Sequence, residues 1–163
     1  MDDLSESTSI RQAEPADAAL VCQFIHELAE YERLAGECAA TPSGIEATLF
    51  NTKPHAFCDI AERNGEPAGF ALWFYSYSTF HARPGIYLED LYVRPPFRGA
   101  GIGRMLLKHL AKRAVEEGCA RFEWSVLDWN EPSIKFYEAL GAKPVSGWTR
   151  YRLDGQALRT LAS

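Results

Sequence analysis

Long apolar runs are missing from this sequence of 163 residues, and none approaches the roughly 20 residues that a membrane-spanning helix needs. The chain starts with acidic and polar residues, so we expect neither a signal peptide nor membrane attachment. Cysteine is also scarce: Cys22, Cys38, Cys58 and Cys119 form no C-x-x-C pair and no pairing with histidine. We therefore expect no metal site, and free thiols in a reducing, cytoplasmic compartment.

Acidic residues outnumber basic residues, which gives a net charge of −5, but the two kinds of charge are unevenly distributed along the chain. Residues 1–46 hold ten acidic side chains against Arg11 and Arg33, whereas residues 94–113 hold six basic side chains and no acidic one. A nucleic-acid-binding domain would be basic overall, so we expect no such partner. The distribution favours a cationic substrate and an anionic cofactor, although a solvated helix face and a disordered tail would also explain the acidic part.

The length predicts a single domain over residues 8–163 that follows a disordered tail over residues 1–7. Apolar residues recur at helical spacing in some segments, while others are rich in β-branched and aromatic residues. We expect strands over residues 8–12, 57–63, 67–77, 86–93, 121–126 and 148–153, with a loop over 78–85, and helices after Pro15 and over 42–50, 102–117, 132–140 and 156–161. Strands followed by helices that pack on the sheet predict an α+β fold.

Residues 86–107 hold the strongest functional signal. The strand over 86–93 carries two adjacent carboxylates, Glu89 and Asp90, in an otherwise apolar setting. A glycine-rich turn then leads into a helix, which directs unpaired amides and the positive end of the helix dipole at one small volume. That volume suits a phosphate group.

Glycine-rich turns are common, and on glycines alone a plain loop is the better interpretation. The turn reads G-x-G-x-G, which does not fit the Rossmann fingerprint, and no Gly-Lys-Ser/Thr follows to complete a Walker motif. The neighbouring basic residues nevertheless favour an anionic ligand.

Arg98-x-x-Gly101-x-Gly103 resembles the acetyl-CoA pyrophosphate loop of the GNAT acetyltransferase superfamily. The strings YLEDLYV, RGAGIG and WNEPSIKFYEALGA resemble the spermidine/spermine and thialysine (diamine) acetyltransferase branch. This resemblance implies the GNAT fold, with a mixed, mostly antiparallel central sheet of about six to seven strands flanked by helices. The sheet would be splayed between the strands at 86–93 and 121–126 to admit the pantetheine arm.

The resemblance also implies roles for single residues. Glu89 would accept the proton of the amine, although a buried strand glutamate satisfied by backbone donors is the alternative. Tyr137 would be the general acid for the departing thiolate, although its spacing alone would fit a core tyrosine. Strand alternation places Asp90 on the face opposite Glu89. The family has a β-bulge near this point, however, so Asp90 stays a candidate amine contact.

The remaining candidates fall into two groups. The cofactor-binding residues implied by the resemblance are Leu91, Tyr92, Val93, Arg98, Gly99, Ala100, Gly101, Ile102, Gly103, Arg104, Asn130 and Ser133. The substrate-binding residues are Tyr31, Glu32, Glu89, Asp90, Glu123, Trp124 and Ser125.

The function implied is acetyl transfer from acetyl-CoA to a small primary amine by direct attack in a ternary complex, in a homodimer. The loop at 77–81 lacks the aspartate that polyamine acetylators carry there, which favours a thialysine-like, lysine-like or diamine substrate over spermidine. A polyamine acetyltransferase, a protein acetyltransferase and a non-catalytic acetyl-CoA sensor are the alternatives.

Overall fold

A computed structural model describes residues 7–163, and these form two compact units, residues 7–125 and Val126–Ser163. The tail expected over residues 1–7 lies outside the described residues except for Ser7. No helix in the described part of the chain is long and apolar enough to cross a membrane.

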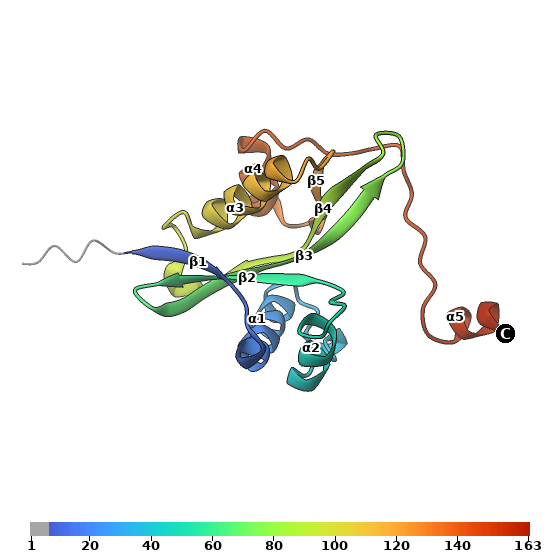
Figure 1. Ribbon diagram of the computed structural model, residues 1–163, viewed down its shortest axis with the longest axis horizontal. Coiled ribbons are helices and arrows are strands. Elements are labelled where there is room, and N and C mark those ends of the chain that lie inside the picture. Colours follow the sequence, from blue (N-terminus) through green and yellow to red (C-terminus); the bar gives the residue numbers. More distant parts are fainter. Residues whose placement is uncertain (1–6) are drawn as a thin grey trace, which may run out of the picture. The chain divides into compact units, whose positions relative to one another are not determined.

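The first unit is built on one sheet of five strands in the order β1-β2-β3-β4-β5 (Figure 1). Its strands are β1 (Thr8–Gln12), β2 (Phe57–Arg63), β3 (Glu66–Ser78), β4 (Arg83–Val93) and β5 (Phe122–Trp124). Neighbours are antiparallel except for β4 and β5, which are parallel. The mixed sheet and the α+β class are as the sequence predicted.

Helices α1 (Ala18–Tyr31) and α2 (Pro42–Leu49) lie on one face of this sheet, where α2 packs on α1, and α3 (Ile102–Glu116) lies on the other face (Figure 1). The first of these follows a short 3-10 turn, η1 (Pro15–Asp17), which begins at the proline that the sequence marked as a helix start. Thr41 caps α2, since its hydroxyl accepts a hydrogen bond of 3.1 Å from the Gly44 amide.

The core between α1 and the sheet is aromatic. Phe24 stacks on Phe70 of β3, with ring centroids 5.2 Å apart, and meets Tyr92 of β4 edge-on at 6.5 Å. Phe24 and Phe70 are completely buried, and such pairs stabilise a fold by about 1 kcal/mol beyond the area they bury. This packing fixes α1 over the end of β4, where the candidate site lies.

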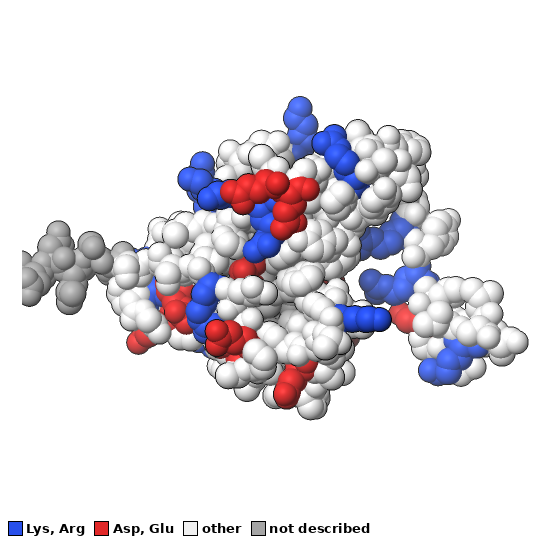
Figure 2. Space-filling view, viewed as in Figure 1, with Lys and Arg blue, Asp and Glu red and all other residues white. Residues whose placement is uncertain are grey.

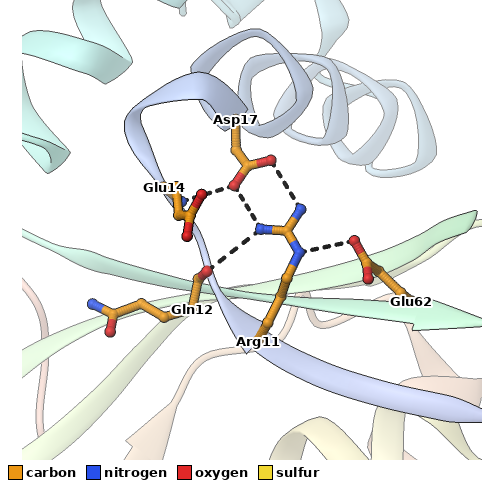
Figure 3. A network of polar contacts seen from close by, with 5 residues as sticks. All are labelled: Arg11, Gln12, Glu14, Asp17 and Glu62. Atoms are coloured by element: carbon orange, nitrogen blue, oxygen red, sulfur yellow. Dashed lines mark hydrogen bonds and ion pairs between the residues drawn. The ribbon is translucent and has the colours of Figure 1, made fainter. Parts of the chain in front are cut away.

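A polar network joins the start of α1 to the first two strands (Figure 3). Arg11 of β1 donates two hydrogen bonds to Asp17, of 2.7 and 2.9 Å, and a third of 2.8 Å to Glu62 of β2. The Asp17 carboxylate also accepts from the Glu14 amide at 2.7 Å. The hydrogen bonds from Arg11 are the main reason why the pKa of Asp17 is lowered.

A second polar group lies between α3 and the opposite face of the sheet. The buried Asp59 carboxylate accepts a hydrogen bond of 2.8 Å from the Trp73 indole, and its other oxygen lies 3.5 Å from Nε2 of His109 on α3. One helical turn after His109, the Arg113 guanidinium lies over the Trp73 ring. One turn further, just after the end of α3, the Glu117 carboxylate accepts a hydrogen bond of 2.6 Å from the Tyr75 hydroxyl. These contacts hold the helix that begins at the glycine-rich turn.

The second unit contains α4 (Glu131–Ala139) and α5 (Gly155–Ala162). The Asn130 side chain caps α4 by accepting a hydrogen bond of 3.4 Å from the Ser133 amide. Between the two helices the chain is irregular and carries exposed apolar side chains, among them Val145, Trp148 and Tyr151.

Three details of the expected fold were wrong. The sheet has five strands instead of six to seven, because residues 148–153 pair with no strand in the described chain and form none. Strand β5 covers three residues of the expected 121–126. The loop expected over 78–85 is a short turn, since β3 and β4 stay paired up to Ser78 and Arg83.

Candidate functional site

The two adjacent carboxylates of β4 lie at a β-bulge. Leu72 of β3 pairs with Asp90 whereas the next residue, Trp73, pairs with Leu88, so Glu89 is an extra residue with no partner in the register. In a regular strand Leu88 and Asp90, two positions apart, would lie on the same side of the sheet. Because of the bulge, Leu88 lies on the α3 side, opposite Trp73, whereas Asp90 lies on the other side with Tyr92. The bulge that the family resemblance implied is therefore present in this chain.

The bulge brings Glu89 and Asp90 near Glu32, the residue that follows the last residue of α1. Burial, followed by the charges of Glu89 and Glu32, raises the pKa of Asp90 to about 7. Burial and the charge of Glu89 also raise the pKa of Glu32. We call these three residues the carboxylate cluster. The cluster concentrates negative charge, and a cationic group bound there would reduce the repulsion between the carboxylates.

Strand β4 has an open edge beyond the bulge. Its parallel pairing with β5 covers only Ile86, Tyr87 and Leu88, and β5 then ends at Trp124. Leu91, Tyr92 and Val93 consequently lie outside that pairing. The Val93 carbonyl accepts a hydrogen bond of 2.8 Å from Arg98 instead, and other backbone groups of this segment that face the β5 side are not used by the β5 ladder. The strands at 86–93 and 121–126 thus separate where the sequence predicted that they would.

Two glycines of the glycine-rich turn have left-handed backbone conformations. Gly99 and Gly101 have φ angles of 84° and 79°, and an added Cβ at either position would meet nothing within 4 Å. Gly101 is the N-cap of the 15-residue helix α3, and no side chain caps it. The first amides of α3 are therefore open to an external acceptor. Ala100 lies between the two glycines of the turn, and Ile102, Gly103 and Arg104 are the first residues of the helix.

Comparison with known proteins identifies the fold and its chemistry. Residues 22–142 match the acetyltransferase (GNAT) family. The chain belongs to this family. It is therefore an acetyltransferase, and GNAT acetyltransferases in general use acetyl-CoA as the acetyl donor.

Named relatives cover nearly the whole chain. It is 38% identical to the thialysine N-epsilon-acetyltransferase of Sus scrofa, over 96% of this chain and 98% of that one. It is 33% identical to an L-ornithine N5-acetyltransferase of Arabidopsis thaliana, over 93% of this chain and 86% of that one. Among solved structures, an integron cassette protein from the mobile metagenome of V. cholerae superposes with a TM-score of 0.82 at 27% identity, covering 96% and 98% of the two chains.

The basic side chains beside the GNAT loop do not all point at a ligand. Arg94 forms an ion pair with Glu27 of α1, with distances of 3.0 and 3.1 Å, and donates to the Pro67 carbonyl at 3.1 Å. The guanidinium of Arg98 lies over the Tyr31 and Tyr92 rings, and its Nε donates to the Val93 carbonyl at 2.8 Å. Basic and acidic side chains also adjoin one another on the face shown in Figure 2. Sequence reasoning overestimated the free positive charge here and missed Glu27.

The residues expected on the β5 side of the site have partners of their own. Glu123 pairs with Arg121 at 3.0 Å, Trp124 packs edge-on against Phe122, and the Ser125 hydroxyl lies 2.7 Å from the Tyr87 hydroxyl. The register places Glu123 beside Tyr87 of β4. Glu123 and Trp124 are consecutive residues of β5, so their side chains lie on opposite sides of the sheet.

Three site candidates belong to α4 in the second unit. Asn130 is buried and acts as the helix cap, so its amide oxygen is occupied by the Ser133 amide. Ser133 and Tyr137 are four residues apart and therefore share one face of α4. The cap was not expected from the sequence, although Asn-x-x-Ser before a helix is a signal for it.

Proposed function

We propose that this protein is an acetyl-CoA-dependent N-acetyltransferase whose substrate is a small primary amine of the thialysine, lysine-like or short diamine type. The observation that carries the proposal is the carboxylate cluster at the bulge, which offers negative charge to a cationic amine. The names of the pig and Arabidopsis relatives support it, since both describe acetylation of a side-chain nitrogen of an amino acid.

The amine has to lose a proton before it can attack. With a reference pKa of about 10.4, the neutral form costs about 4.6 kcal/mol at pH 7. Glu89, which is exposed on the bulge, is the proposed proton acceptor, directly or through a water. Asp90, Glu32 and Tyr31 would hold the amine, and the Glu123, Trp124 and Ser125 side chains would limit its size.

The loop from Arg98 to Arg104 would hold the pyrophosphate of acetyl-CoA on its open amides, with Asn130 and Ser133 as further contacts. Acetyl-CoA supplies the activated acetyl thioester. The amides of Leu91 to Val93 would hold the pantetheine arm and polarise the thioester carbonyl. The amine would attack this carbonyl directly, forming the C–N bond as the C–S bond breaks.

Tyr137 is the proposed source of the proton for the departing thiolate. A phenol with a pKa of about 10 stays protonated at pH 7 and can pass its proton to a thiolate whose thiol has a pKa of about 8.5. Tyr137→Phe should lower kcat by about 10²-fold or more while the Kd of acetyl-CoA stays the same. Unchanged turnover from pH 6 to 9 would make Tyr137 a structural residue.

The experiment that tests the proposal is a measurement of kcat/KM for thialysine, putrescine and spermidine under one set of conditions. Thialysine or putrescine should be preferred, because a long polycation needs carboxylates spaced along its length, and the chain around the turn between β3 and β4 carries Ser78, hydrogen-bonded to His81 at 2.9 Å, and no carboxylate. A tenfold preference for spermidine, about 1.4 kcal/mol, would make the protein a polyamine acetyltransferase instead. No turnover of any amine would favour a non-catalytic sensor.

We also propose a homodimer in the cytoplasm. The exposed Val145, Trp148 and Tyr151, which are 75, 85 and 92% accessible, support the dimer because such side chains commonly mark protein contacts. The four free cysteines support a reducing compartment. Light scattering should give twice the mass of the chain, and a monomer at micromolar concentration would contradict the dimer.

A further inference from the structure

One face of α1 is attached to the segment that follows β4. Phe24, Glu27 and Tyr31 are spaced three and four residues apart and so lie along one side of the helix. Phe24 lies 4.6 Å under the Arg94 guanidinium, Glu27 pairs with the same guanidinium, and the Tyr31 ring lies 5.1 Å from that of Arg98. The two arginines therefore join α1 to the chain entering the glycine-rich turn.

Arg98 has a particular position in this arrangement. It is the first residue of the turn, and its side chain is held by the Val93 carbonyl at 2.8 Å and by the Tyr92 ring at 5.6 Å. Tyr31 is the last residue of α1, and the next residue, Glu32, belongs to the carboxylate cluster. The stacking of Arg98 on Tyr31 thus connects the glycine-rich turn with the proposed amine site.

We propose that Arg98 is a positioning residue for the amine site: its stacking on Tyr31 couples occupancy of the glycine-rich turn to the order of the last turn of α1. This inference rests on the proposed function. An anion on the loop amides restrains Arg98, and the restrained guanidinium gives Tyr31 a fixed surface to pack on. Cofactor binding then prepares Glu32 and Tyr31 for the amine. Because coupling is reciprocal, a change at Tyr31 must also alter cofactor affinity.

Hydrogen–deuterium exchange with coenzyme A, and without any amine, tests the coupling directly. The unchanged protein should gain protection over residues 28–34 when coenzyme A saturates it. Arg98→Met should lose this gain at a coenzyme A concentration that saturates the variant. Lys108→Met, which removes one exposed positive charge from α3, is the matched control and should keep the gain. Equal gains in protection for Arg98→Met and the unchanged protein would overturn the proposal.

The reciprocal experiment changes Tyr31 and measures the Kd of coenzyme A by calorimetry. Tyr31→Leu removes the ring and should weaken binding about fivefold, the range expected for a partly exposed cation–π contact. Tyr31→Phe keeps the ring and should bind as the unchanged protein does. If Tyr31→Phe weakened coenzyme A binding as much as Tyr31→Leu, the effect would belong to the hydroxyl. If neither variant weakened binding, the coupling would be excluded.

Kinetics separate this inference from the proposed function. At an acetyl-CoA concentration that saturates each protein, Arg98→Met should raise the KM of the amine about fivefold and lower kcat by less than this, because saturation offsets the loss of Arg98 from the cofactor loop and leaves the positioning of Tyr31 as the main defect. A protein that binds no coenzyme A would refute both proposals. A protein that acetylates amines, but whose α1 is unaffected by coenzyme A, would refute the coupling alone.

Discussion

Two sets of carboxylates lie on the same side of the sheet and differ in what surrounds them. Asp17 faces Arg11, and the hydrogen bonds between them lower the pKa of its carboxyl. Asp90 is largely buried near the charges of Glu89 and Glu32, and burial followed by these charges raises its pKa to about 7. The first set fastens β1 to α1, as Figure 3 shows. In the second set, the groups that set the pKa of Asp90 include two carboxylates and no cation. A carboxyl whose pKa is raised in this way is typical of a functional site.

The largest expected effect comes from neutralising the carboxylate cluster. The double variant Glu89→Gln, Asp90→Asn should lower kcat/KM for the amine by about 10²-fold or more at pH 7, because the proton acceptor and the charge that attracts the amine are both lost. Steady-state kinetics on a panel of amines would measure this. Asp17→Asn is the control, and it should leave kcat/KM of the folded protein unchanged. Equal losses in the two variants would remove the distinction between the sets.

The pH dependence of stability should show opposite signs for the two sets. Because the pKa of Asp90 is raised by folding, the folded state binds its proton more tightly than the unfolded state between about pH 4 and 7, and stability falls as pH rises through this window. The change should be on the order of 2 kcal/mol, less than the full shift implies because the side chain keeps some contact with solvent. Urea unfolding at pH 4.5 and 7.5 would measure it, and Asp90→Asn should flatten the slope.

Asp17 should behave in the reverse way, with a smaller effect. Its lowered pKa means that it stabilises the folded state above its unfolded pKa of about 4, and that this contribution is lost as pH falls through the folded value. Asp17→Asn should cost about 1–2 kcal/mol at pH 7, discounted because Arg11 is partly exposed. Glu66→Gln on the exposed start of β3 is a matched charge control. If Asp17→Asn and Glu66→Gln had the same free energy of unfolding at pH 7, the hydrogen bonds between Asp17 and Arg11 would not stabilise the fold.

The smallest expected effect is the release of protons when an amine binds. A cationic amine on the cluster should lower the pKa of Asp90 and release less than one proton at pH 6.5, because only the protonated fraction can respond. Calorimetry with a diamine in buffers of different ionisation enthalpy would measure the release. The Asp90→Asn variant should release almost none, and a release equal to that of the unchanged protein would assign the proton to another group.

The sequence predicted most of the elements because their signals are local. The Asn64-Gly65 turn, the cap at Thr41 and the glycine that closes α3 need only neighbouring residues, and the structure has positive φ angles at Asn64, Gly65 and Gly118. The strand expected over 148–153 failed because a strand requires a partner as well as suitable residues.

The site was predicted in part. Adjacent carboxylates in an apolar strand and a glycine turn before a helix are visible in the sequence, but the facing groups are far away in the chain. Arg94 and Glu27 are separated by 67 positions, so their pairing could not be inferred from spacing. Regular alternation would have separated Glu89 from Asp90, and only the family resemblance indicated the bulge that brings them together.

The bulge has a consequence for how the strand tolerates insertions and deletions. Leu88, just before Glu89, faces the interior under α3, and Asp90 and Tyr92 after it face the interior under α1. Deleting Glu89 would leave Leu88 opposite Trp73 and Asp90 opposite Leu72, so the remaining side chains would keep their sides of the sheet and only the bulge and its carboxylate would be lost. Deleting any other residue of the strand would move the side chains beyond it to the opposite face. Loss of one codon should therefore disturb the fold less at Glu89 than at the neighbouring positions of β4.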